Sequence, residues 1–263
     1  MEYSTALATQ FIQFLLVFAR VTGTLTTAPV FGSKVIPVVA RIGLSMLLAF
    51  FILPVSTFAA GKAPTSLLVL AWWMLLEVLY GLTAGYVAAL FFYSVQMAGE
   101  LIDMQIGFGM INMFDPQFGQ QVPLIGNFKF LMAISVFLAL QGHHVLIMAM
   151  AENFRAVPLG GAIHLADATS FMVDAVANLF VMALKISLPV LGTVLMTDVA
   201  LGILARIMPQ MNVFVVGITG KLVVGMFMLF LILPFYVSFL EVGFAGIYRD
   251  FLRIFYIVGQ GLR

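Results

Sequence analysis

The stretch LLVLAWWMLLEVLYGLTAGYVAALFFYSVQMA, Leu67–Ala98, decides the fold class of this chain. It runs for 32 residues with Glu77 as its only charge, whereas about 20 apolar residues suffice to cross the hydrocarbon of a bilayer. The stretch is therefore predicted to be a membrane helix, either tilted or extending beyond the bilayer. Gly81 and Gly85 inside it match the spacing of small residues that lets membrane helices approach closely, which predicts tight packing against another helix.

Other apolar segments of membrane length lie on both sides of this one. Their approximate bounds are Ala8–Ala28, Ile42–Ala60, Phe130–Met150, Phe171–Met196 and Val213–Phe239. The whole chain of 263 residues is 63% hydrophobic and 9% charged, whereas soluble domains average about 45–50% apolar and about 25% charged. No soluble fold of this length can bury so much apolar surface. We therefore predict an all-α integral membrane protein with about six long hydrophobic helices in hairpins.

Composition and charge exclude several classes of function. The net charge is +1 and the twelve Lys and Arg residues are scattered, whereas nucleic-acid binding needs a clustered basic face. The chain has no cysteine and therefore no disulfide or thiol chemistry. His143 and His144 are adjacent, so a helix would point them about 100° apart, away from a shared metal ion. Because neither a nucleophile–base pair nor a pair of carboxylates is visible, we predict no catalytic site, no cofactor and no metal.

The connection between the third and fourth segments is unusually apolar. It begins Gly107-Phe-Gly-Met-Ile-Asn-Met-Phe-Asp-Pro116, and its apolar members are Phe108, Met110, Ile111, Met113 and Phe114. Gly107 and Gly109 free the backbone on one side, and Asp115-Pro116 favours a turn on the other. Loops are normally polar because they meet water. An apolar, methionine-rich loop must bury itself against something, and one candidate is a pore that it closes.

Charged side chains also occur within or at the ends of the apolar segments. They are Arg20, Glu77, Asp174, Lys185, Asp198 and Lys221. A charge at the bilayer centre costs about 2.5–3.5 kcal/mol, so each needs a partner, a water-filled cavity or a place outside the hydrocarbon. An ion relay is one interpretation. We favour structural pairs and subunit interfaces, because no single segment concentrates these residues. Glu100 and Asp103, just before the loop, either line a polar throat or are solvated at a helix end, and we favour the second.

Several motifs follow one another in order along the chain. They are Arg20-Val-Thr-Gly-Thr-Leu-Thr-Thr-Ala-Pro-Val-Phe-Gly32 with Ile36-Pro37 and Arg41, then Glu100-Leu-Ile-Asp-Met-Gln-Ile-Gly-Phe108 with Phe114-Asp-Pro116 and Gln121-Val-Pro-Leu-Ile-Gly126, and finally Arg206-Ile-Met-Pro-Gln-Met-Asn-Val-Phe214. They resemble the opening, the central loop and the late signature of the FliR family, which are export-gate proteins of flagellar type III secretion. The resemblance covers essentially the whole chain.

This resemblance implies a subunit of a helical export gate. One FliR-type subunit would assemble with several FliP-type and FliQ-type subunits, with FlhB-type and FlhA-type export proteins as further partners. The gate would pass unfolded flagellar proteins through the bacterial inner membrane, within the flagellar basal body, and much of it would stand above the bilayer plane. Residues 1–167 would form a FliP-like part with the plug loop at 107–127, and residues 168–263 a FliQ-like hairpin hinged at Pro209. Arg20, Glu77, Glu100, Asp174, Lys185 and Lys221 would be structural or interface charges.

Two other functions remain open from the residues. One is a secondary transporter of small solutes with a binding site at the bilayer midplane, for which the charges inside the apolar segments would be the relay. The other is a purely structural scaffold, whose apolar loop packs inside the assembly without gating it. The gate is the leading hypothesis, because apolar side chains such as Phe108, Met110 and Met113 can close a constriction by dewetting it.

Overall fold

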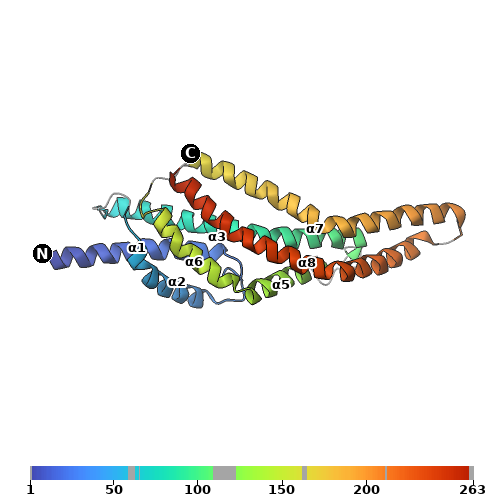
Figure 1. Ribbon diagram of the computed structural model, residues 1–263, viewed down its shortest axis with the longest axis horizontal. Coiled ribbons are helices and arrows are strands. Elements are labelled where there is room, and N and C mark those ends of the chain that lie inside the picture. Colours follow the sequence, from blue (N-terminus) through green and yellow to red (C-terminus); the bar gives the residue numbers. More distant parts are fainter. Residues whose placement is uncertain are drawn as a thin grey trace. The chain divides into compact units, whose positions relative to one another are not determined.

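Helices make up almost all of the described chain. The computed structural model describes residues 2–58, 63–64, 66–108, 123–161, 165–210 and 212–260. Its helices are α1 (Glu2–Thr27), α2 (Val38–Ile52), the 3-10 helix η1 (Leu53–Val55), α3 (Leu67–Ile106), α5 (Leu124–Ala139), α6 (Gly142–Ala156), α7 (Leu165–Ile207) and α8 (Val213–Gln260) (Figure 1). Within these ranges the β-type pairing is limited to one bridge, between Phe58 and Leu159. The predicted all-α fold is confirmed.

Most of the predicted spans correspond to single helices. α1, α2 continued by η1, α3, α7 and α8 are each long and apolar enough to cross a membrane. α3 is 40 residues long, and at about 1.5 Å per residue it is roughly twice as long as the hydrocarbon core is thick. The expectation that this helix is too long for a perpendicular span therefore holds for the structure.

The predicted segment Phe130–Met150 differs from the others, because it is a bent pair of helices. α5 and α6 meet there at an angle of 71°. Gln141, the residue before α6, has a φ of 56°. That left-handed conformation is uncommon for a residue with a side chain, and it interrupts the helical path. The pair can count as one span only as a broken helix.

α7 and α8 form the long hairpin at the end of the chain. α7 ends at Ile207 and α8 begins at Val213, so the connection contains Pro209, as the sequence predicted. Pro189 lies inside α7 and Pro234 inside α8. Proline is tolerated in membrane helices where neighbouring groups take up the freed backbone carbonyl. Just after Pro189, the hydroxyl of Thr193 donates to the carbonyl of that proline at 2.8 Å.

The helices divide into two compact units. Unit 1 comprises residues 1–91, 138–176 and 243–263, and unit 2 comprises residues 92–137 and 177–242. α3, α7 and α8 each pass from one unit into the other. The grouping by contacts therefore cuts across the predicted division at residue 168. That division concerns likeness to FliP-type and FliQ-type subunits, and it remains a prediction.

Within unit 1, α1 and α3 touch backbone to backbone at the paired small residues. A Cβ atom added to Gly81 would collide with the carbonyl of Arg20, and one added to Gly85 would collide with the carbonyl of Thr24. On the facing helix, a Cβ on Gly23 would lie 2.6 Å from the carbonyl oxygen of Val78. The close packing predicted from Gly81 and Gly85 is confirmed, and these helices tolerate no side chain at the crossing.

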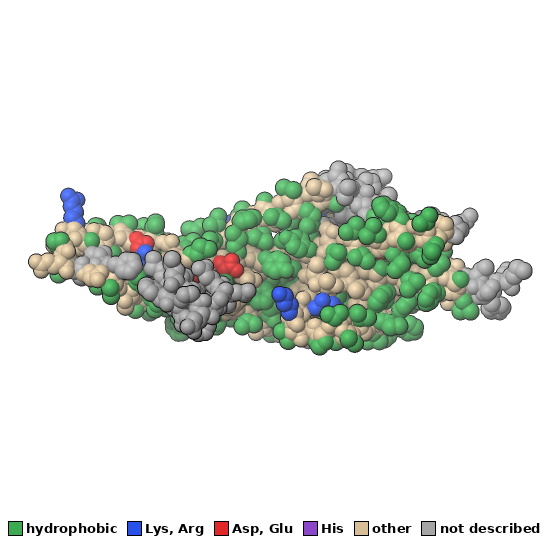
Figure 2. Space-filling view, turned by 180° about the vertical axis from the view of Figure 1, so that it is seen from behind, with side chains coloured by type: hydrophobic (Ala, Val, Ile, Leu, Met, Phe, Trp, Pro, Cys, Tyr) green, Lys and Arg blue, Asp and Glu red, His purple; other side chains and the backbone are tan. Residues whose placement is uncertain are grey.

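Much of the outer surface is apolar. Figure 2 shows one face covered largely by hydrophobic side chains, with only scattered charged ones among the residues that it colours. Leu68 is 84% exposed, Val39 81% and Phe230 73%. Contiguous apolar surface of this kind does not face water in a stable protein. Lipid or neighbouring subunits must cover it.

Candidate functional site at the base of the apolar loop

The predicted plug lies at the edge of the described structure. Gly107 and Phe108 are described, whereas Gly109, Met110, Ile111, Met113, Phe114, Asp115 and Pro116 lie outside the described residues. The geometry available is therefore that of the loop's base, where α3 ends at Ile106 and α5 begins at Leu124. Every contact described at this base lies within unit 2.

The carboxylate of Asp103, on α3, caps the first turn of α5. One carboxylate oxygen accepts the backbone N–H of Ile125 at 3.1 Å, and the other accepts those of Ile125 and Gly126 at 3.0 and 3.1 Å. The first N–H groups of a helix lack partners within the helix, and the helix dipole favours a negative charge beside them. Asp103 supplies both the acceptor and the charge across 22 positions of sequence.

This arrangement corrects the expectation for Asp103. The side chain is 5% exposed, so it is neither solvated at a helix end nor lining an open throat. A local sign of the cap exists in the sequence. The residues before α5 are Val122 and Pro123, neither of which can supply the side-chain oxygen that helix starts normally use. An uncapped helix start implies an acceptor from elsewhere, although it does not identify Asp103.

Two glycines bring α3 and α5 into contact beside the cap. A Cβ atom added to Gly99 would lie 2.6 Å from the backbone nitrogen of Gly126 and 2.9 Å from the carbonyl carbon of Ile125. Backbone atoms cannot move aside as flexible side chains do, so any side chain at Gly99 separates the helices. Because the cap joins the same two helices, their separation would also lengthen the hydrogen bonds of Asp103.

The loop leaves α3 over a hydrophobic core. Five residues of this core are buried: Ile102, Ile106, Ile125, Val190 and Val194. Phe108, the first apolar residue of the loop, packs against them. Gly107 has a φ of +97°, and its N–H donates to the carbonyl of Asp103 at 3.2 Å, as glycines that end helices commonly do. The chain thus turns at Gly107, and Phe108 is packed on the core of unit 2.

A short polar chain connects the end of α3 to the α7–α8 hairpin. Gln105 donates to one carboxylate oxygen of Asp198 at 3.4 Å, and Lys221 pairs with the other at 2.5 Å. The side chains of Lys221 and Asp198 are 27% and 34% exposed. The predicted charge Lys221 therefore has an ion-pair partner inside the chain.

Arg20 and Glu77 form a buried ion pair in unit 1. Both side chains are 1% exposed, and Nε of Arg20 donates to Glu77 at 2.5 Å. Nη1 of Arg20 also donates to the side chain of Asn153 at 3.0 Å and to the carbonyl of Val157 at 2.8 Å. The second oxygen of Glu77 accepts the N–H of Gly160 at 3.1 Å. The pair thus ties α1, α3 and α6 together, and its additional hydrogen bonds offset the cost of burying two charges.

The remaining predicted charges are less constrained by the chain itself. Glu100 accepts a hydrogen bond from Gln96, one turn earlier on α3, at 3.1 Å. Asp174 and Lys185, both on α7, are exposed. In the described part of the chain, no group of three or more His, Asp and Glu residues is placed to hold a metal ion. The paired charges described here therefore act on the packing of the helices.

Comparison with known proteins gives consistent matches along nearly the whole chain. The sequence model of the bacterial export proteins, family 1, matches residues 11–247. The flagellar biosynthetic protein FliR of Bacillus subtilis (strain 168) is 38% identical over 225 residues, which cover 83% of this chain and 85% of the relative.

Relatives of lower identity occur in other bacteria. The FliR protein of Pectobacterium carotovorum subsp. carotovorum is 31% identical over 236 residues, 90% of each chain. That of Escherichia coli (strain K12) is 28% identical over 230 residues, covering 88% of this chain and 87% of the relative. The range matched by the family includes Asp103, Gly126 and the whole apolar loop between them.

Proposed function

We propose that this chain, which belongs to family 1 of the bacterial export proteins, is a structural and gating subunit of the flagellar type III export gate. A role in the flagellar export apparatus follows from the family and from relatives named flagellar biosynthetic protein FliR. Proteins of this kind are components of an export apparatus and not enzymes. The finer proposal is that the apolar loop closes the conduit through which unfolded flagellar proteins pass.

The observation that carries this proposal is the Asp103 cap. It fastens the start of α5 to the end of α3, so both ends of the loop are held on one rigid base. A plug needs such a base, because a loop whose two ends are not fixed would not stay in the conduit and keep ions and water out. The residues between the ends include Met110, Ile111 and Met113. Apolar side chains close a constriction by dewetting it, and methionine can repack around varied passengers.

We further propose that FliP-type and FliQ-type subunits surround this chain, with one copy in each gate and FlhB-type and FlhA-type proteins beside it. The gate would sit in the bacterial inner membrane, within the flagellar basal body and largely above the bilayer plane. The apolar outer surface supports neighbours of this kind, because residues such as Leu68 and Phe230 need cover. Exposed charges on α7, Asp174 and Lys185, would then face those subunits and not lipid.

The alternative, a secondary transporter with a midplane site, has less support. A relay needs ionisable groups that can exchange ions along a path. Arg20 and Glu77 instead neutralise each other in a buried pair, and Lys221 is paired with Asp198. The expected structural pairs account for these charges without a solute pathway.

The decisive experiment removes the apolar character of the loop in cells that produce the complete export apparatus. One variant lacks residues 108–114, and a second keeps the loop length but replaces the apolar residues from Met110 to Phe114 with serine. Both should make the membrane leak ions while the amount of assembled complex on native gels stays unchanged. Normal conductance with normal assembly would leave the loop as a scaffold and end the gating proposal.

A further inference from the structure

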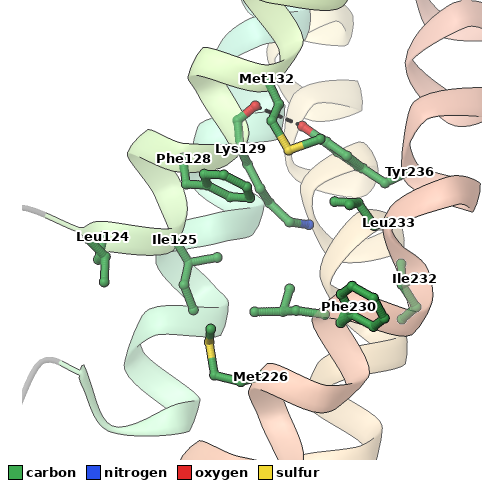
Figure 3. Close-up of a pocket in the computed structure, with 11 residues that line it drawn as sticks. Leu124, Ile125, Phe128, Lys129, Met132, Met226, Phe230, Ile232, Leu233 and Tyr236 are labelled. Carbon is green, nitrogen blue, oxygen red and sulfur yellow. Dashed lines mark hydrogen bonds between the residues drawn. The ribbon is translucent and has the colours of Figure 1, made fainter.

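Unit 2 contains an apolar cavity to which the proposed gating function gives no role. It has a volume of about 410 Å³ and lies between α5 and α8 (Figure 3). Its walls include Leu124, Ile125, Phe128, Met226, Phe230 and Leu233. Leu124 is 62% exposed and Phe230 is 73% exposed, so the rim of the cavity is open and apolar. Such a rim requires an apolar occupant.

Among the described residues that line this cavity, Lys129 is the one cation. Lys129 extends from α5 among the apolar walls, and only 5% of the residue is exposed (Figure 3). Its Nζ atom has no hydrogen-bond partner among the described residues. The ring of Tyr236, centred 4.6 Å from Nζ, gives it a cation–π contact. A buried ammonium without an anion is costly, so Lys129 needs a partner that the described part of the chain does not supply.

We propose that the cavity receives an apolar membrane helix of a neighbouring protein, and that an Asp or Glu on that helix pairs with Lys129. The negative charge of this carboxylate would neutralise the ammonium group of Lys129. The apolar walls of the cavity would contact the apolar side chains of the same helix. The flexible four-carbon stem of lysine lets Nζ turn to an entering carboxylate. This goes beyond the proposed function, on which it rests only for the presence of neighbouring membrane helices.

The chemistry of the cavity favours a carboxylate side chain over a lipid phosphate. A phosphate group has several oxygens that need several donors, and it stays near the water interface. Of the described lining residues only Lys129 is a cation, and the hydroxyl of Tyr236 already donates to the backbone carbonyl of Lys129 at 3.0 Å. A carboxylate on an apolar helix needs only the one amine and brings its own apolar surface.

The first test is photo-cross-linking in cells that produce the complete apparatus. Benzoylphenylalanine replaces Phe230 on the rim, and in a matched control it replaces Phe235, which lies on the same helix, is 75% exposed and does not line the cavity. The probe at Phe230 should attach to a membrane helix that carries Asp or Glu within about one turn of the attachment point. Adding Lys129→Met should reduce this product roughly tenfold or more. It should leave both the product at Phe235 and the amount of chain in the membrane unchanged.

The second test exchanges the charges. Lys129→Arg should keep the cross-link and motility, and Lys129→Glu should lose both. Changing the partner carboxylate to lysine should then restore both in the Lys129→Glu background. This rescue separates a specific ion pair from a folding defect, because a misfolded chain cannot be repaired by a charge on another protein.

Three results would overturn the proposal. The probe at Phe230 could attach to phospholipid, its product could survive Lys129→Met unchanged, or Lys129→Glu could be rescued within this chain by Asp115→Lys. Rescue by Asp115→Lys would mean that Lys129 pairs with a residue of this chain and not with a neighbouring protein. A loop deletion that fails to leak would end the gating function and leave these cross-links unaffected, so the two proposals can fail separately.

Discussion

Asp103 holds the backbone N–H of Ile125 with both oxygens of its carboxylate, at 3.0 and 3.1 Å, although 22 positions separate the two residues. The bond joins the helix before the apolar loop to the helix after it. Gly99 and Gly126 allow the approach, and Phe108 packs on the core beside it. The base of the loop is therefore held by specific hydrogen bonds, a close helix contact and side-chain packing.

Removing the Asp103 carboxylate should weaken this base. We expect Asp103→Ala to cost about 1–3 kcal/mol, because a charged acceptor at a helix start is lost in a buried place. Asp103→Asn should lose less, since its amide oxygen can still accept. The thermal midpoint of the purified gate complex measures the effect. Glu100→Ala, one turn earlier and bonded only to Gln96 in the described structure, is the matched control. Equal midpoints for all variants would contradict the role of the cap.

Adding one methyl group at the helix contact should have a similar effect. Gly99→Ala places a Cβ against the backbone of Gly126, and we expect reduced amounts of assembled complex and reduced motility. Gly202→Ala adds the same group on α7, where nothing in the described structure lies within 4 Å. Native gels and swimming assays compare the two. If Gly99→Ala assembles as well as Gly202→Ala does, the close approach of α3 and α5 is not required.

Breaking the buried pair in unit 1 should be severe. Arg20→Met leaves Glu77 charged, buried and without its main partner, and we expect a loss of about 3–5 kcal/mol. Combining it with Glu77→Gln should recover part of the loss, because Gln keeps an acceptor for the N–H of Gly160 and carries no charge. Chain levels in membranes, followed over time after synthesis stops, report the order of stability. A double variant no better than Arg20→Met would argue that the charge is not the cause.

Exchanging the charges of Lys221 and Asp198 tests whether Lys221 acts within this chain or on a neighbouring subunit. Lys221→Glu should impair assembly, since it places a second acidic side chain beside the carboxylate of Asp198. Exchanging both charges, with Asp198→Lys added, should restore assembly if the pair acts within this chain. Native gels distinguish the cases. Failure of the exchange would mean that Lys221 also contacts a neighbouring subunit.

Hydropathy and helix breakers made much of the fold predictable. The length of α3, the hinge at Pro209 and the apolar loop are written in local composition, because a bilayer selects long apolar helices and proline or glycine interrupts them. The bend between α5 and α6 was not predictable in the same way. It depends on the left-handed backbone of Gln141, and the single glycine that follows, Gly142, does not by itself predict a bend inside a long apolar segment.

The charges show the same limit more clearly. The sequence by itself determined that Arg20 and Lys221 need partners, since an isolated charge in an apolar helix is costly. It also determined which segment is the apolar loop. Only the tertiary structure decided that Arg20 meets Glu77, 57 positions away, and that Asp103 caps α5. The physical reason is that hydropathy is a property of the local sequence. The partner of a charged side chain depends instead on which helices, distant in sequence, pack together.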